Sequence, residues 1–181
     1  MKKKYKMNKI LCLLILIPNL LLAQNIRWQE FKPYGGKFQM TAPGALAEKK
    51  EIIETAVGKI EYHTFFYQTL EADSALYLVS YCDYPEGSLH SDSTELLKEF
   101  FESTVQTAVK DLKGDLRYSA PQKLQDFPAY TWRIDYRKGK AALRSRAVVV
   151  GSRYYLMQVA VKKEKSLSPM SDKFLDSFRL L

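Results

Sequence analysis

A group of arginines in the C-terminal third of the chain is the most promising chemical feature of this sequence. Arg133, Arg144 and Arg146 flank Lys138-Gly139, which is predicted to be the two-residue turn of a β-hairpin. With that turn, Arg133 stands opposite Arg144, and all three guanidinium groups share one face of the sheet with Asp135. Guanidinium groups pair bidentately with carboxylate or phosphate. The pattern therefore predicts a basic surface that binds an anionic ligand or an acidic protein partner.

Two other interpretations of these arginines stay open. A three-residue turn at Lys138-Gly139-Lys140 would shift the register and send Arg144 and Arg146 to the opposite face. Alternatively, Asp135, solvent and the carboxylates of a helix neutralise the arginines, and the face is only a solvated surface.

Other residue types that often do chemistry lack the spacing for it. The chain has two histidines, His63 and His90, and neither has a partner at the spacing that zinc sites use. Cys82 lies in an apolar stretch without a basic neighbour, which favours a buried structural thiol. Neither a Gly-x-Ser-x-Gly motif nor a phosphate-binding glycine loop is present. We therefore expect no catalytic residue, no metal site and no cofactor.

Residues 1–23 are predicted to be an export signal. Lysines crowd the first nine positions, residues 10–17 are apolar, and small Ala23 is a plausible last residue of the leader. Without this segment 23 basic side chains face 20 acidic ones, so the pI of 9.3 is poor evidence for nucleic-acid binding. We expect a periplasmic or secreted protein, residues 24–181, that binds no nucleic acid and does not span a membrane. An uncleaved signal anchor is the alternative.

The remaining sequence predicts one α+β domain with a central antiparallel sheet flanked by helices. Apolar residues at spacings of three and four predict a helix that ends near Leu112, with Asp92 and Glu95 as its capping box and Gly114 as its stop. Trp132 is expected to anchor the core beneath this helix. Alternating residues and turn signals predict strands at 37–41, 51–56, 59–67, 75–82, 116–124, 130–136, 141–150 and 153–161, and Pro169 is expected to open a helix that includes Phe174, Phe178 and Leu181.

Several of these segments together resemble small exported PsbP-like domains, which are related in fold to the extrinsic P subunit of the photosynthetic oxygen-evolving complex. The similar segments are the aromatic lead-in Trp28, Phe31 and Tyr34, then Gly36-Lys37-Phe38, Ala42-Pro43-Gly44, the hairpin at Gly58, the Tyr81–Pro85 passage and the closing Phe174–Phe178. The resemblance implies an α/β/α sandwich in a non-enzymatic protein that binds or assembles with others. It does not imply the photosynthetic role, and no metal or chloride site matches residue by residue.

These observations favour an exported, non-catalytic binding or accessory protein of the cell envelope. One alternative is a small exported enzyme, hydrolase-like, which should show a deep pocket with clustered titratable groups. The other alternative is a structural or interaction protein of the envelope, which should show an exposed apolar patch.

Overall fold

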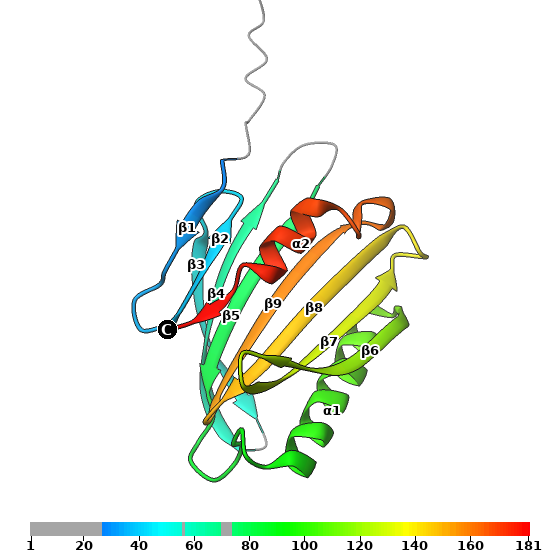
Figure 1. Cartoon of the computed structure of the whole chain (residues 1–181). Coiled ribbons are helices and arrows are strands. Elements are labelled where there is room, and N and C mark those ends of the chain that lie inside the picture. Colours follow the sequence, from blue (N-terminus) through cyan, green and yellow to red (C-terminus); the bar gives the residue numbers. More distant parts are fainter. Residues whose placement is uncertain (1–26, 56, 70–73) are drawn as a thin grey trace, which may run out of the picture.

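Two antiparallel sheets form the framework of the computed structural model, which describes residues 27–55, 57–69 and 74–181 (Figure 1). The larger sheet has the spatial order β3-β4-β5-β9-β8-β7-β6. Its strands are β3 (Ala47–Thr55), β4 (Gly58–Gln68), β5 (Leu76–Asp83), β6 (Asp115–Leu124), β7 (Phe127–Tyr136), β8 (Ala141–Val150) and β9 (Arg153–Lys162). The smaller sheet, with the order β1-β2-β10, consists of β1 (Gln29–Phe31), β2 (Phe38–Ala42) and β10 (Arg179–Leu180).

Short hairpins account for most of the larger sheet. The predicted hairpin at Gly58 is confirmed, since β3 and β4 pair from Ala47↔Phe66 to Thr55↔Gly58. Strand β5 lies between β4 and β9, in the interior of the sheet. The four strands β6 to β9 form one continuous meander.

The register of β7 on β8 follows the two-residue turn considered above. Arg133 pairs with Arg144, Thr131 pairs with Arg146, and Tyr136↔Ala141 is the last pair before the loop. The three-residue alternative is therefore wrong. Because successive side chains of a strand point to opposite faces, this register puts the arginines on one face and Trp132 on the other.

Helix α1 (Thr94–Leu112) packs on the face of the large sheet that carries Trp132. Leu97, Phe101 and Val105 are the buried residues of the helix and belong to the same apolar cluster as Trp132, which is 1% exposed. The expected anchoring of the core beneath this helix is confirmed. The 3.6-residue period of the sequence sets this contact, since spacings of three and four keep the three side chains on one stripe.

The ends of α1 differ in part from the expectation. The capping box is wrong: the helix begins one residue after Ser93, whose side chain makes no capping hydrogen bond. At the other end Lys113, rather than Gly114, takes the left-handed conformation, with φ 48°. Gly114 is needed for a different reason, because a Cβ there would lie 2.8 Å from the backbone oxygen of Asp135. The glycine thus lets the end of the helix approach β7 closely.

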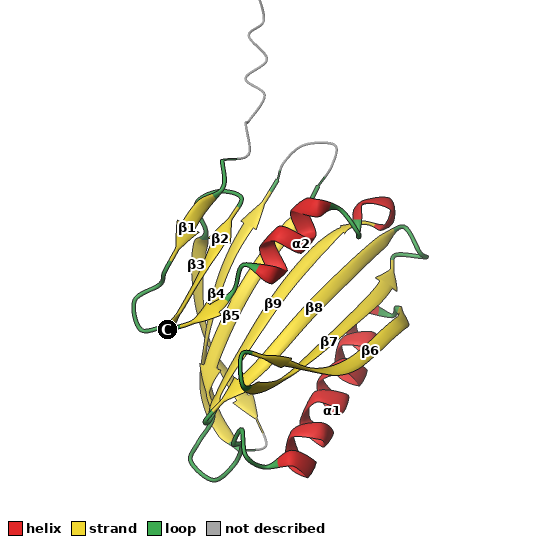
Figure 2. Ribbon diagram, in the orientation of Figure 1, coloured by secondary structure: helices red, strands yellow, loops and turns green. Residues whose placement is uncertain are grey.

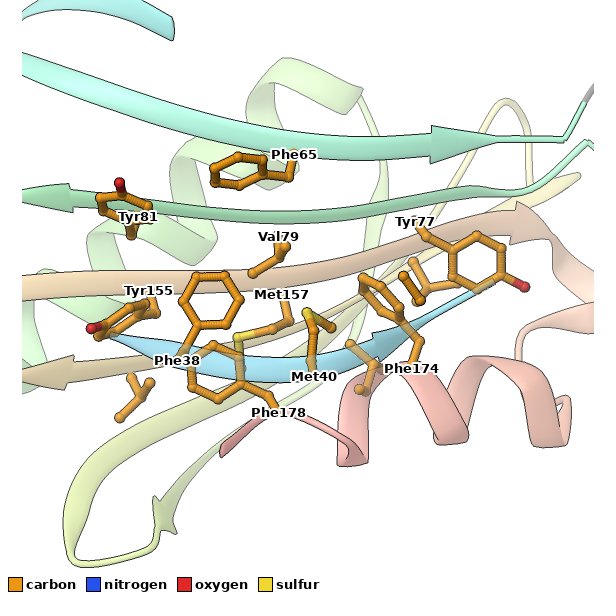
Figure 3. Packing of buried hydrophobic residues seen from close by; sticks show 14 of the residues in the cluster. Phe38, Met40, Phe65, Tyr77, Val79, Tyr81, Tyr155, Met157, Phe174 and Phe178 are labelled. Atoms are coloured by element: carbon orange, nitrogen blue, oxygen red, sulfur yellow. The ribbon is translucent and has the colours of Figure 1, made fainter. Parts of the chain in front are cut away.

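The opposite face of the large sheet is covered by helix α2 (Pro169–Asp176) and by the smaller sheet (Figures 1 and 2). Aromatic side chains fill the space between the layers, as Figure 3 shows. The ring of Phe38 stacks on Phe178 at 4.9 Å, and Phe174 meets Tyr77 edge-on at 5.3 Å. The predicted closing helix is too long, because α2 ends at Asp176 and the chain then pairs with β2 as β10.

The two helices therefore lie on opposite faces of a mostly antiparallel sheet, and the α+β class is confirmed (Figure 2). The expected α/β/α sandwich describes the arrangement only in part, because the layer that contains α2 also contains the smaller sheet. Neither helix in the described ranges is long and apolar enough to cross a bilayer.

Candidate functional site

Positive charge gathers at the end of the large sheet where β7 turns into β8 and β9 runs into the short 3-10 helix η1 (Lys163–Lys165). The surface there is a wide, open hollow of about 1150 Å³. Among the described residues that line it are five cations and one acid, Glu164. We call these cations, Arg133, Arg137, Lys140, Lys162 and Lys163, the basic end.

The β7–β8 loop holds one of these cations, Arg137, and its neighbour Lys138 in an unusual backbone conformation. Arg137 and Lys138 have φ values of 52° and 56°, and Gly139 follows with φ 76°. The left-handed region is uncommon for residues other than glycine and costs such a residue about 1–2 kcal/mol. A hydrogen bond from the Lys163 N–H to the Lys140 carbonyl, 3.1 Å long, joins this loop to η1. The two basic segments are thereby held side by side.

A buried carboxylate organises the cations behind the hollow. Asp135 is 2% exposed and accepts a hydrogen bond of 2.9 Å from Arg133 Nε. Lys163 Nζ lies 3.2 Å from its second oxygen, and Arg117 Nε lies 3.7 Å away. Burial alone would raise the pKa of Asp135, but the contacts with Arg133 and Lys163 outweigh it and lower the pKa below the ordinary 3.8. Asp135 therefore offsets part of the positive charge of Arg133 and Lys163.

The three arginines lie on one face of β7 and β8, as the register predicts, but their guanidinium groups pair with different carboxylates. Arg133 lines the basic end, whereas Arg144 and Arg146 lie under α2. Arg144 Nη1 is 2.7 Å from Asp172 of the helix, and Arg146 Nη2 is 2.8 Å from Asp176. Two carboxylates of α2 therefore pair with these guanidinium groups inside the protein, as the alternative interpretation has it. Binding of an outside anion by Arg144 and Arg146 stays a prediction.

The reasoning from sequence did not assign Lys140, Lys162 or Lys163 to a site. The available signal was two basic runs, Arg137-Lys138-Gly139-Lys140 and Lys162-Lys163-Glu164-Lys165. Each looks like an ordinary solvated turn when taken alone. They meet because β8 and β9 pair from Ala141↔Lys162 to Val150↔Arg153, which returns the chain to the end where β8 began.

A cluster of weakly acidic groups lies in the core under α1, away from the basic end. Cys82 is buried, as expected, and burial raises the pKa of its thiol to about 12. Burial likewise raises the pKa of Tyr84 to about 12, and it raises the pKa values of Tyr62 and Tyr154 further. These four residues line neither of the two hollows described here, so the cluster gives the enzymatic alternative no support.

A second, smaller hollow of about 430 Å³ lies between α1 and the β6–β7 hairpin. Leu97, Phe101, Pro121 and Tyr130 are among its lining residues, and its surface is mostly apolar. Its volume is within the range of small-molecule pockets. Phe101 and Tyr130, both lining residues, stack with their ring centroids 5.4 Å apart.

The two histidines take part in local contacts. His63 Nε2 lies 2.9 Å from Glu61, and its ring stacks on Tyr81 at 4.5 Å. His90 Nδ1 lies 3.4 Å from Asp92. Across residues 27–55, 57–69 and 74–181, no group of three or more His, Cys, Asp or Glu side chains is arranged to hold a metal ion.

Comparison with known proteins places the architecture among PsbP-like folds. The solution structure of cyanobacterial PsbP (CyanoP) from Synechocystis sp. PCC 6803 superimposes with a TM-score of 0.54, over 86% of this chain and 94% of that one. The identity is 12%, so the similarity shows the fold alone. No family model matches the sequence. The search of curated proteins also found no match.

Proposed function

We propose that this chain is an exported, non-catalytic binding or accessory protein of the cell envelope whose basic end takes a carboxylate- or phosphate-bearing ligand. The observation that carries the proposal is the open hollow, whose lining within the described part of the chain includes five cations and one acid. Like charges gathered on one surface repel each other, and an outside anion relieves that repulsion. The hollow exceeds an ordinary small-molecule pocket and stays open, which suits an anionic group on a larger partner.

The geometry of the β7–β8 loop supports the same proposal. Strained backbone is concentrated at functional sites, where the surrounding structure holds it in place. Two cationic residues in the left-handed region, Arg137 and Lys138, sit in this loop, and the hydrogen bond from Lys163 fixes its position against η1. The loop thus presents Arg137 and Lys140 to a ligand at a fixed distance from η1.

The test is a set of double variants that each remove two positive charges. Arg137→Ala/Lys140→Ala removes two cations from the basic end, and Arg144→Ala/Arg146→Ala removes the pair under α2. Lys59→Ala/Lys98→Ala is the matched control, since both lysines are exposed and belong to β4 and α1, outside the basic end. Binding of inorganic phosphate and of polyglutamate is measured by calorimetry and thermal shift at low and physiological salt.

The proposal expects polyglutamate to bind the wild type and the control, to weaken with salt, and to be lost in Arg137→Ala/Lys140→Ala. If only Arg144→Ala/Arg146→Ala loses polyglutamate binding, the binding site lies between α2 and the sheet and not at the basic end. Equal affinity in all four proteins, or binding in none, would mean that the basic end is a solvated surface.

Export is the second part of the proposal, and it rests on residues 1–23, which lie outside the described residues. Intact-mass measurement of the protein recovered from the cell envelope is expected to show a chain that starts near Gln24. A full-length product retained in the membrane would contradict cleavage and favour the uncleaved anchor.

A further inference from the structure

The large sheet ends in two edge strands that differ in how open they are to pairing. Strand β6 carries Pro121 and a register shift between Leu116 and Tyr118, two features that hinder pairing with another strand. Strand β3 has neither: its nine residues pair with β4 in one unbroken register and contain no proline. Every second residue of an edge strand presents an unpaired N–H and C=O to its open side. β3 is therefore the edge that could accept a further strand.

Exposed apolar side chains lie on this same edge. Ile52 is 72% exposed and Ile53 is 41% exposed, on opposite faces of β3. Every residue of the strand from Ala47 to Glu54 is exposed. A long edge strand with exposed isoleucines favours association with other chains, because its unpaired N–H and C=O groups can bind a further strand. The order of charged residues along β3 indicates which strand would pair with it.

We infer that β3 pairs with β3 of a second copy of this chain, antiparallel and centred on Ile52. When two copies of a strand pair antiparallel about a two-fold axis perpendicular to the sheet, residues directly opposite each other have their side chains on the same face. Because side chains alternate between faces, the numbers of two opposite residues differ by an even number, and their sum is therefore even. Centring on Ile52 puts Ile52 against its own copy and Lys50 against Glu54 of the second copy, twice. The fit rests on this self-complementary order: Lys50, Ile52 and Glu54 share one face of the strand.

Only the register centred on Ile52 sets Lys50 against Glu54; centring on Ile53 sets Ile52 against Glu54 instead. Centring on Glu51 sets that carboxylate against its own copy, and centring on Lys50 sets two ammonium groups together. Like charges directly opposite each other destabilise a sheet. The groups that face the proposed pairs from β4 are His63 opposite Lys50, Glu61 opposite Ile52, and Lys59 opposite Glu54. Lys50 also lies 3.5 Å from Glu48 within its own strand, an exposed contact that an intermolecular pair can replace.

The test exchanges the two charges separately and together. Lys50→Glu and Glu54→Lys each set like charges opposite each other twice in the proposed dimer. Each is expected to weaken dimerisation by about tenfold or more. Lys50→Glu/Glu54→Lys restores opposite charges and should restore the dimer. A mixture of the two single variants should form a heterodimer, since their charges complement each other. Lys49→Glu is the matched control, because Lys49 lies on the other face, opposite Thr55 of the second copy.

Sedimentation velocity on the protein purified after export, with its N-terminus recorded by intact mass, reports the dimer up to near-millimolar concentration. Melting curves of each variant show that the monomer is folded. A wild-type protein that stays monomeric overturns the inference. The charged side chains of β3 would then serve to prevent pairing with other strands. A dimer that survives Lys50→Glu places the interface elsewhere. Weakening by Lys49→Glu but not by Lys50→Glu contradicts the register.

Discussion

Replacing Asp135 by asparagine tests the carboxylate that organises the basic end. The asparagine keeps the size and one acceptor oxygen but removes the charge that faces Arg133, Lys163 and Arg117. The lost contact with Arg133 should account for most of the loss of stability. The side chains of Arg133 and Asp135 are only 14% and 3% exposed, so water screens their interaction little. A hydrogen bond to a charged group contributes about 1.5–3 kcal/mol. The two pairs with half-exposed cations add about 0–1 kcal/mol each.

The variant should therefore lower the free energy of unfolding by about 2–4 kcal/mol at pH 7, measured by urea denaturation. The folded-state pKa of Asp135 is lowered below 3.8, so its stabilising effect is present above about pH 4 and is lost as the pH falls through the folded-state value. The difference between wild type and variant should shrink below pH 4. A difference that stays constant from neutral to acidic pH would refute the electrostatic explanation and point to repacking.

Asp172→Asn is the matched control for this prediction. It also removes a carboxylate from an arginine, at 2.7 Å, but its side chain is 48% exposed, so a loss of about 1 kcal/mol or less is expected.

Three further predictions follow from individual residues. Trp132→Ala should lower the free energy of unfolding by about 3–5 kcal/mol, because the side chain is 1% exposed under α1, and an unchanged melting curve would contradict this. Lys138→Gly should raise stability to urea by about 1 kcal/mol, because glycine takes φ 56° without strain, whereas Lys49→Gly in the extended strand β3 should lower it. Cys82 should make the free energy of unfolding fall as the pH rises from about 9 toward 12, because burial raises the pKa of its thiol from the ordinary 9.0 of the unfolded chain to about 12. Cys82→Ala should reduce that slope.

Local patterns in the sequence were enough to predict the elements of this fold that depend on near neighbours. The stripe of Leu97, Phe101 and Val105 indicated both α1 and the face that it buries, because a helical period fixes which side chains lie together. The alternation around Trp132, with a turn at Lys138-Gly139, fixed the register of β7 on β8. The end of the chain was less well predicted, because its last residues form β10 only through pairing with β2, far away in sequence.

The basic end shows what the tertiary structure alone decided. Repulsion among Arg133, Arg144 and Arg146 was visible in the sequence, but the carboxylates that relieve it at Arg144 and Arg146 come from α2, whose docking the sequence does not specify. The loops at Arg137–Lys140 and Lys162–Lys165 meet because β8 and β9 return the chain to the same end of the sheet. Periodicity specifies which face of an element is buried, whereas the neighbours of a charged side chain depend on how distant elements pack. Electrostatic sites are therefore decided at the tertiary level, after the strands and helices are set.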